Sequence, residues 1–222
     1  MSRPRGILWR LTEPIARRSR EHRFQRFMQL MDPQPTDRVL DVGVTDADWR
    51  AGNFFESRYP WPAQITAVAP QPLPAFARTF PEVEFVAADG RQLPFADKTF
   101  DIGFSNAVVE HVGSREDQRR FVTELVRTCR RVFICTPNAA YPVDPHTLLP
   151  FVHWLPRAAR HRVLRATGNG HWASEEQLNP LRATDLLGMF SPQDSARLVS
   201  QRLLFLTSVL IAITERRPTT EA

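Results

Sequence analysis

Short apolar runs alternate with amphipathic segments through the middle of this chain. The runs have the length and the unbroken apolar character of strands that are buried on both faces of a parallel sheet. Five of them predict strands, at residues 38–42, 64–69, 83–89, 100–107 and 131–137. Because strands that alternate with helices form βαβ units, the pattern predicts a mostly parallel sheet.

Helices are predicted before and between these strands. Residues 19–31 place four large apolar side chains on one helical stripe, with Ser19 as a candidate N-cap. Residues 114–129 repeat apolar side chains at helical spacing, and Ser114 is placed to cap them. Further helices are predicted at residues 46–59, 73–80 and 181–190.

The last apolar segments, residues 197–206 and 208–214, read as two paired strands. The predicted fold is therefore α/β: a doubly wound, seven-stranded, mostly parallel sheet that ends in a C-terminal antiparallel hairpin. The expected organisation is a basic leader and helix at 1–31, one domain at 32–217 with a lid or substrate insertion at about 138–180, and a disordered tail at 218–222.

Composition fits this picture. The chain has 222 residues, of which 42% are apolar and 24% charged, as in soluble globular domains. No apolar run reaches the roughly 18 residues of a membrane-spanning helix, and arginines interrupt the N-terminus before a signal-peptide core can form. Cys129 and Cys135 lack a CxxC spacing, so we expect reduced core thiols in a cytoplasmic protein.

Positive charge is concentrated in two places. The first 26 residues hold eight arginines and two glutamates, and four more arginines lie within residues 157–165. These clusters are either solvated helix faces or a surface for an anionic partner, such as a phosphorylated substrate or the inner face of a membrane that the protein contacts peripherally. Aromatic residues are not interleaved with the arginines, which argues against nucleic acid.

One segment carries a specific combination of motifs. Residues 87–112, AADGRQLPFADKTFDIGFSNAVVEHV, contain an acid at the end of the third strand, then Leu-Pro-Phe, Phe-Asp and Glu-His. With this spacing the chain resembles the class I S-adenosylmethionine-dependent methyltransferases, in their methyltransferase type 11-like form, over about residues 38–137. The resemblance implies a Rossmann-like fold, S-adenosyl-L-methionine as cofactor and methyl transfer (EC 2.1.1.-) as the activity.

The resemblance also implies cofactor-binding roles. Asp89 would accept a hydrogen bond from the adenine amino group, and Gly90 and Arg91 would present backbone beside the ring. Leu93 and Phe95 would pack near the adenine face. The residues that would line the pocket near the transferred methyl group are Ser105, Asn106 and His111.

The turn after the first strand departs from the family pattern of acid-x-Gly-x-Gly-x-Gly. Asp41 and Gly43 match, whereas Thr45 and Ala47 replace the second and third glycines. Threonine adds a Cβ where glycine lets the backbone approach a ligand. It could instead cap the next helix or form a hydrogen bond with the ligand.

The acids of this turn favour a cationic ligand. Asp46 and Asp48 could contact the ammonium or sulfonium group of S-adenosylmethionine, and they would repel a dinucleotide pyrophosphate. The second strand, however, ends in Ala69, Pro70 and Gln71, where the family usually has an acid that holds the ribose. Gln71 offers only an uncharged contact, which lowers the binding free energy by about 1.5–3 kcal/mol. An alternative therefore stays open: a catalytically degenerate methyltransferase-fold protein that serves as a binding or scaffolding module.

The insertion offers candidate acceptor-binding residues, which are Tyr141, His146, His153 and Trp154. His146 is the first candidate general base and His111 the second, although a histidine that only bonds a loop carbonyl is equally compatible with each position. The apolar insertion beside arginines suits a small-molecule or lipid-linked acceptor. No metal site is expected, because His146 and His153 have no cysteine or acid at ligand spacing.

Overall fold

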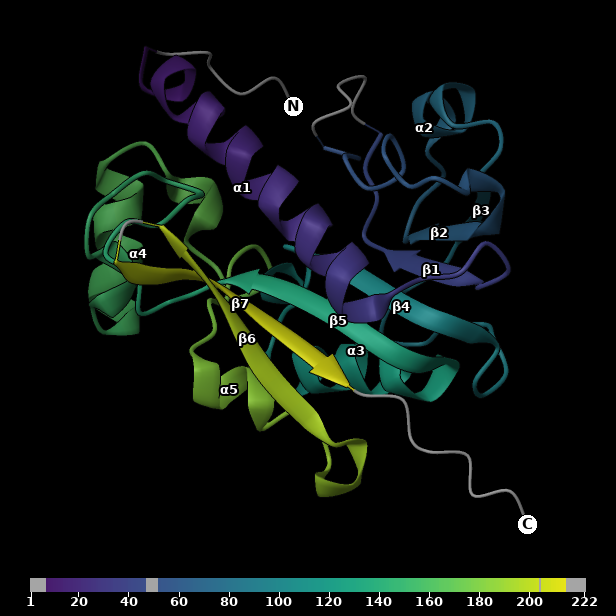
Figure 1. Cartoon of the computed structure of the whole chain (residues 1–222). Helices are drawn as coiled ribbons and strands as arrows, with labels where there is room; N and C mark the ends of the chain where they lie inside the picture. Colours follow the sequence, from purple (N-terminus) through teal and green to yellow (C-terminus); the bar gives the residue numbers. More distant parts are fainter. Residues whose placement is uncertain (1–6, 47–51, 204, 215–222) are drawn as a thin grey trace.

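A seven-stranded sheet forms the centre of the computed structural model, which describes residues 7–46, 52–203 and 205–214 (Figure 1). The strand order is β3-β2-β1-β4-β5-β7-β6. The strands are β1 Val39–Val42, β2 Ile65–Ala69, β3 Glu84–Ala87, β4 Phe100–Asn106, β5 Cys129–Pro137, β6 Ala196–Leu203 and β7 Leu206–Thr214.

Strand directions confirm the predicted doubly wound fold. The first five strands are parallel to one another, and β7 runs antiparallel between β5 and β6 as part of the C-terminal hairpin. The order reverses between β1 and β4, which are neighbours in the sheet. In such a sheet the carboxyl ends of these two strands form the crevice where ligands bind. We call this place the switch point.

The N-terminal helix is longer than predicted. The structure describes α1 at Ile7–Met31, with Pro14 inside it, so Ser19 does not cap a helix. The Ser19 hydroxyl instead accepts a hydrogen bond from Gln201 Nε2 at 2.8 Å and so ties α1 to β6. The helix crosses one face of the sheet (Figure 1).

Phe27 anchors α1 on that face. Its side chain is fully buried, and its ring contacts those of Phe55, Phe104 and Phe133 edge to face, at centroid distances of 5.0, 5.3 and 5.5 Å. The short helix α2, Pro74–Thr79, contributes Phe76 to the same apolar cluster. The N-terminal helix therefore belongs to the core of the domain.

The opposite face is covered by α3, Arg115–Thr128, and the short α5, Ala183–Leu187. Ser114 caps α3 as predicted, because its hydroxyl accepts a hydrogen bond from the backbone of Asp117. The predicted helix at residues 181–190 is reduced to α5.

The segment after β1 differs from its prediction. A helix was expected at residues 46–59, but the described part, residues 52–58, consists of turns. The Asn53 side chain explains the turns: its Oδ1 accepts from Thr45 N at 3.0 Å and its Nδ2 donates to Thr45 O at 2.8 Å. The expectations for Ala47, Asp48 and the tail at 218–222 lie outside the described residues.

The insertion after β5 carries the helix α4, Arg157–Ala166, and a small core of its own. Val152, Leu164 and Ala173 form that core. Both cysteines are free and buried, and burial raises the pKa of each thiol to about 12. Within the described ranges, no helix combines the length and apolar character needed to cross a membrane.

Candidate functional site

Gly43 makes the turn at the switch point possible. Its φ of +116° is one that side-chain-bearing residues rarely adopt. A Cβ at this position would lie 2.1 Å from Val108 Cγ2, in the loop after β4. The backbone of the β1 turn and the β4 loop therefore approach each other at a position that only glycine fits.

The tip of β4 holds an acceptor oxygen with no partner. Asn106 Oδ1 is buried and receives no hydrogen bond from any described residue. Ser105 beside it was expected to line the pocket, but its fully buried hydroxyl donates to Val42 O at 3.0 Å. Ser105 thus links β4 to β1, and Asn106 is the residue that remains available to a ligand.

The polar side chains of the β1 turn have structural partners. Asp46 Oδ1 accepts hydrogen bonds from the backbone nitrogens of Ala75 and Phe76, at 2.6 and 3.0 Å. The Asp46 carboxylate therefore satisfies the first turn of α2 through Oδ1, and its expected contact with a cationic cofactor stays a prediction. Thr45 is likewise held by Asn53, through both its backbone nitrogen and its carbonyl oxygen.

The Asp41 side chain is buried and is not exposed to solvent in the crevice. It is buried at the end of β1 and interacts with Glu56, which is also buried. Burial raises the pKa of the Asp41 carboxyl group well above its ordinary value, and the charge of Glu56 raises it further. Burial also raises the pKa of Glu56, whereas its hydrogen bond with Asp41 lowers it. We infer that Asp41 keeps a proton and donates it to Glu56 in a hydrogen bond.

Asp89 is exposed beyond the end of β3, and Arg91 holds its carboxylate. The Arg91 guanidinium lies 2.7 Å from Asp89 Oδ2 and 3.1 Å from Asp117 Oδ1. The hydrogen bond from the Arg91 side chain is the main reason that the pKa of Asp89 is lowered. Three N–H groups of Arg91 contact this carboxylate: the backbone nitrogen at 2.9 Å from Oδ1, Nη2 at 2.7 Å from Oδ2, and Nε at 3.1 Å from both oxygens. These contacts occupy about all of the lone pairs of an ionised carboxylate, so a ligand would have to replace one of them.

The segment after Asp89 is packed tightly. A Cβ on Gly90 would lie 2.6 Å from the Phe121 ring. Phe95 packs edge to face on Phe100 at a centroid distance of 4.9 Å, and Leu93 is buried in the same core, so both residues contribute to the packing of this face of the sheet. Gln71, beyond β2, is exposed.

A second polar cluster forms where the loop after β4 meets the insertion. It consists of Glu110, His111 and His146, which we call the histidine–glutamate triad. Glu110 is only 1% exposed, and its Oε1 accepts no hydrogen bond within the part of the chain that the structure describes. Nε2 of His111 and Nε2 of His146 each lie 3.9 Å from that oxygen. Glu110 Oε2 accepts from the Thr136 hydroxyl at 3.0 Å.

The two histidines are oriented by their other ring nitrogens. His111 Nδ1 lies 2.6 Å from the carbonyl oxygen of Gln177, and His146 Nδ1 lies 3.0 Å from Asp144 Oδ1. The ring of Trp172 packs against both imidazoles, at centroid distances of 5.6 and 5.2 Å. The triad thus joins residues from the β4 loop and the insertion, so the fold places an acid next to His146 that its neighbours in the sequence did not reveal.

Asp144 is fixed at this position. Burial raises the pKa of its carboxyl group, but hydrogen bonds from His146 and Thr147 and the charge of His146 outweigh burial and lower it overall. The Thr147 hydroxyl donates to Asp144 Oδ2 at 2.7 Å.

Other predicted acceptor residues have local roles. His153 Nε2 lies 2.5 Å from the Tyr141 carbonyl oxygen, and burial lowers the pKa of His153. Trp154 Nε1 donates to the carbonyl oxygen of Ala139. His153 thus bonds a loop carbonyl, as His111 does through Nδ1. The structure does not bring Trp154 to the triad.

Sequence reasoning missed four residues of these clusters: Glu56, Glu110, Asp144 and Trp172. The Glu-His pair and the Asp-Pro-His sequence at residues 144–146 were the only signals for the triad. Neither indicates that the β4 loop and the insertion meet.

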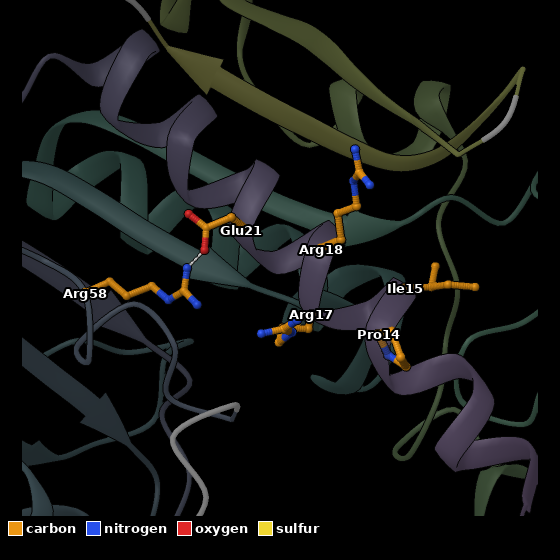
Figure 2. Close-up of a pocket in the computed structure, with 6 residues that line it drawn as sticks. All are labelled: Pro14, Ile15, Arg17, Arg18, Glu21 and Arg58. Atoms are coloured by element: carbon orange, nitrogen blue, oxygen red, sulfur yellow. Dashed lines mark ion pairs between the residues drawn. The ribbon is translucent and has the colours of Figure 1, made fainter.

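A cavity of about 540 Å³ lies between α1 and Arg58 (Figure 2). Its lining residues are Pro14, Ile15, Arg17, Arg18, Glu21 and Arg58. Arg58 forms an ion pair with Glu21, which leaves the lining with net positive charge. None of the predicted site residues lines this cavity.

Comparison with known proteins identifies a shared domain. Residues 51–132 match the family model described as "Methyltransferase domain". Two curated relatives, uncharacterized proteins from two strains of Mycobacterium tuberculosis, are 33% identical over 86 residues. That stretch covers 36% of this chain and 29% of each relative, so the chain spans less than a third of the curated relatives that it matches.

Solved structures share the fold. The N-methyltransferase NodS from Bradyrhizobium japonicum is 13% identical, with a TM-score of 0.57 and coverage of 93% of this chain and 99% of that one. Phosphoethanolamine N-methyltransferase 2 from Haemonchus contortus, solved with S-adenosyl-L-methionine, is 14% identical, with a TM-score of 0.55 and coverage of 81% and 38%. At these identities the likeness shows the fold alone.

Proposed function

We propose that this chain, which has the fold and the domain of the class I S-adenosylmethionine-dependent methyltransferases, transfers a methyl group from that cofactor to a small-molecule or lipid-linked acceptor. The observation that carries the proposal is the switch point. There Gly43 allows a close backbone approach, and Asn106 offers a buried oxygen without a partner. Ligands of doubly wound sheets bind at this place.

The residues present fit the cofactor in most respects. Asn106 Oδ1 is an acceptor suited to an ammonium group. We assign the adenine amino group to exposed Asp89, where its N–H would replace one of the hydrogen bonds from Arg91. The ribose contact is the exception, because exposed Gln71 replaces the acid that the family usually has. We expect weaker cofactor binding than a charged ribose contact would give.

When bound, S-adenosylmethionine supplies a methyl group that its sulfonium already activates. The chain's own task is mainly to position the acceptor and, where that acceptor is a hydroxyl, to remove its proton. We assign this task to the histidine–glutamate triad, two of whose residues, Glu110 and His111, follow Val108 on the loop after β4.

Support for a lipid-linked acceptor comes from the insertion. Phe151 and Trp154 are 52% and 47% exposed, and their rings contact each other at a centroid distance of 4.9 Å. Helix α4, which begins three residues after Trp154, carries four arginines along ten residues. Exposed aromatic rings beside arginines suit an amphiphilic molecule with an anionic head group.

The direct test is calorimetric titration of the full chain with S-adenosylhomocysteine. We expect saturable binding, which Asp89→Ala weakens about tenfold to a hundredfold because a charge-assisted hydrogen bond is lost. Glu82→Ala is the matched control, since it removes an exposed carboxylate before the same strand.

Each contrary outcome has a distinct meaning. If Asp89→Ala binds as tightly as the unchanged chain, the adenine assignment is wrong. If the unchanged chain shows no binding at about millimolar ligand, roughly 4 kcal/mol of binding free energy, then the methyltransferase proposal fails. The internal bonds of Thr45 and Asp46 and the missing ribose acid would then favour the binding or scaffolding module.

A further inference from the structure

We propose that the histidine–glutamate triad binds a divalent transition-metal ion, and that zinc is the ion its ligands fit best. The three ligand atoms are Glu110 Oε1, His111 Nε2 and His146 Nε2, and all lie within 4.8 Å of one another. Glu110 is almost completely buried, and its Oε1 lacks a hydrogen-bond partner among the described residues.

The hydrogen bonds of the histidines determine which nitrogens face the carboxylate as acceptors. A carbonyl oxygen can only accept, so His111 Nδ1 must donate to Gln177 O. By the same reasoning, His146 Nδ1 donates to the Asp144 carboxylate. In the neutral form each imidazole then carries its lone pair on Nε2. Three lone-pair atoms thus converge at one point, and a cation there would bind all three and give the buried Glu110 oxygen the partner that it lacks among the described residues.

The distances favour an ion over direct hydrogen bonds. Both Nε2 atoms lie 3.9 Å from Glu110 Oε1, beyond the roughly 2.7–3.2 Å of an N–H···O bond. Zinc bonds to histidine and carboxylate of about 2.0–2.2 Å keep ligand atoms more than about 3 Å apart. Small side-chain rotations would therefore bring the three atoms to coordination distance.

The surroundings match those of metal sites in proteins. A ligating histidine usually donates its other N–H to a carboxylate or a backbone carbonyl, which fixes its orientation and increases its basicity. Asp144 and Gln177 provide one partner of each kind. Thr136 in turn donates to the second oxygen of Glu110.

Two histidines and one carboxylate leave at least one coordination position open, as in catalytic rather than structural zinc sites. This part of the inference rests on the proposed methyl transfer. An acceptor hydroxyl group bound in the open position would release its proton more readily, since zinc lowers the pKa of a hydroxyl group that it binds. The ion would then replace His146 as the group that activates the acceptor, so His146 would serve as a ligand.

The experiment uses the full chain without a histidine tag, stripped of metal with a chelator and titrated with zinc chloride in the absence of cofactor. We expect one zinc ion per chain. His146→Ala and, separately, His111→Ala should lower the affinity by at least about a hundredfold, and Asp144→Asn by about tenfold to a hundredfold. His171→Ala removes an exposed histidine of the same insertion and should leave the affinity unchanged.

Circular dichroism establishes that each variant is folded. Anomalous diffraction from zinc-soaked crystals of the unchanged chain should place the ion between the three ligand atoms, and this measurement needs no variant. Absence of zinc binding, or equal affinity in folded His146→Ala, would overturn the proposal. Tighter binding of Fe²⁺ than of Zn²⁺ would overturn the assignment to zinc. Because S-adenosylhomocysteine binding is measured separately, loss of the metal proposal leaves the methyltransferase proposal intact.

Discussion

Asp41 and Glu56 place two carboxyl groups in the core directly beneath the switch point. Taking a charge out of water disfavours its ionised form, which explains why burial raises the pKa of both groups. A proton shared between them satisfies one oxygen of each and leaves Glu56 Oε1 without a partner among the described residues. The free energy of unfolding should therefore depend on pH through this pair.

The sign of this coupling can be tested with Asp41→Asn. Because the folded-state pKa of Asp41 lies above its ordinary value of 3.8, the folded chain binds more protons than the unfolded chain in the window above that value. The free energy of unfolding should then fall as pH rises through this window. Asparagine can still donate to Glu56 but does not titrate, so its curve should be flatter.

Urea denaturation between about pH 4 and pH 8 measures this difference. Glu82→Gln, an exposed position, is the control and should follow the unchanged chain. Parallel curves for Asp41→Asn and the unchanged chain would contradict the assignment of a raised pKa to Asp41.

At the scale of elements, α1 connects regions that are distant in the chain. Ser19 bonds to Gln201 in β6, Glu21 pairs with Arg58 in the turn after β1, and Phe27 packs on β4 and β5. Half-buried Arg23 also lies near the triad: burial lowers its pKa, whereas the charge of Glu110 raises it. The helix thus holds the sheet and the site loops in one arrangement.

Removal of the Phe27 ring should destabilise the whole domain. Phe27→Ala leaves a cavity among three aromatic neighbours and should lower the free energy of unfolding by about 3–5 kcal/mol. The control is His22→Ala, at an exposed position on the same helix, which should change the free energy of unfolding by less than about 0.5 kcal/mol. A loss below about 1 kcal/mol in Phe27→Ala, measured by urea denaturation, would show that α1 is not part of the cooperative core.

At the scale of the whole molecule, exposed apolar side chains gather in the insertion. Phe151, Trp154 and Leu155 are all exposed and are followed at once by the arginines of α4. Arg157 pairs with Glu175 at 2.6 Å, so part of this charge is balanced locally. Weak, salt-sensitive binding to anionic membranes is the expected behaviour of such a surface.

Flotation with vesicles tests this expectation. The chain should bind vesicles that contain phosphatidylserine and should not bind vesicles of phosphatidylcholine alone. The double change Phe151→Ser and Leu155→Ser should reduce binding about tenfold, since each removes apolar area that would be buried. Leu187→Ser, at an exposed position on α5, is the control. Equal binding to both kinds of vesicle, or none to either, would rule out this surface as a membrane contact.

Most of the fold could be predicted because its signals are local. Fully buried strands such as β1 and β2 appear as continuous apolar runs, and the Ser114 cap marks the start of α3. The helix predicted after β1 was wrong because a side-chain contact determines the conformation of that segment. Asn53 bonds back to Thr45 across eight positions, and no helical pattern reveals that competition.

The site could be predicted only in part. Gly43, Asn106 and Asp89 lie at strand ends, where the order of elements alone places them near a crevice. The structural partners of Asp46 and Ser105 could not be predicted, because Ala75 and Val42 lie 29 and 63 positions away in the chain. The triad depends on how the insertion folds back over the β4 loop, and one sequence holds no signal for that contact.

The contact of Trp172 with both imidazoles of the triad has a practical consequence. An indole in van der Waals contact with an imidazole changes its fluorescence when that ring gains positive charge or coordinates a cation. Trp172 should therefore act as an intrinsic optical reporter, so the state of this cluster can be followed in real time without a dye or a label.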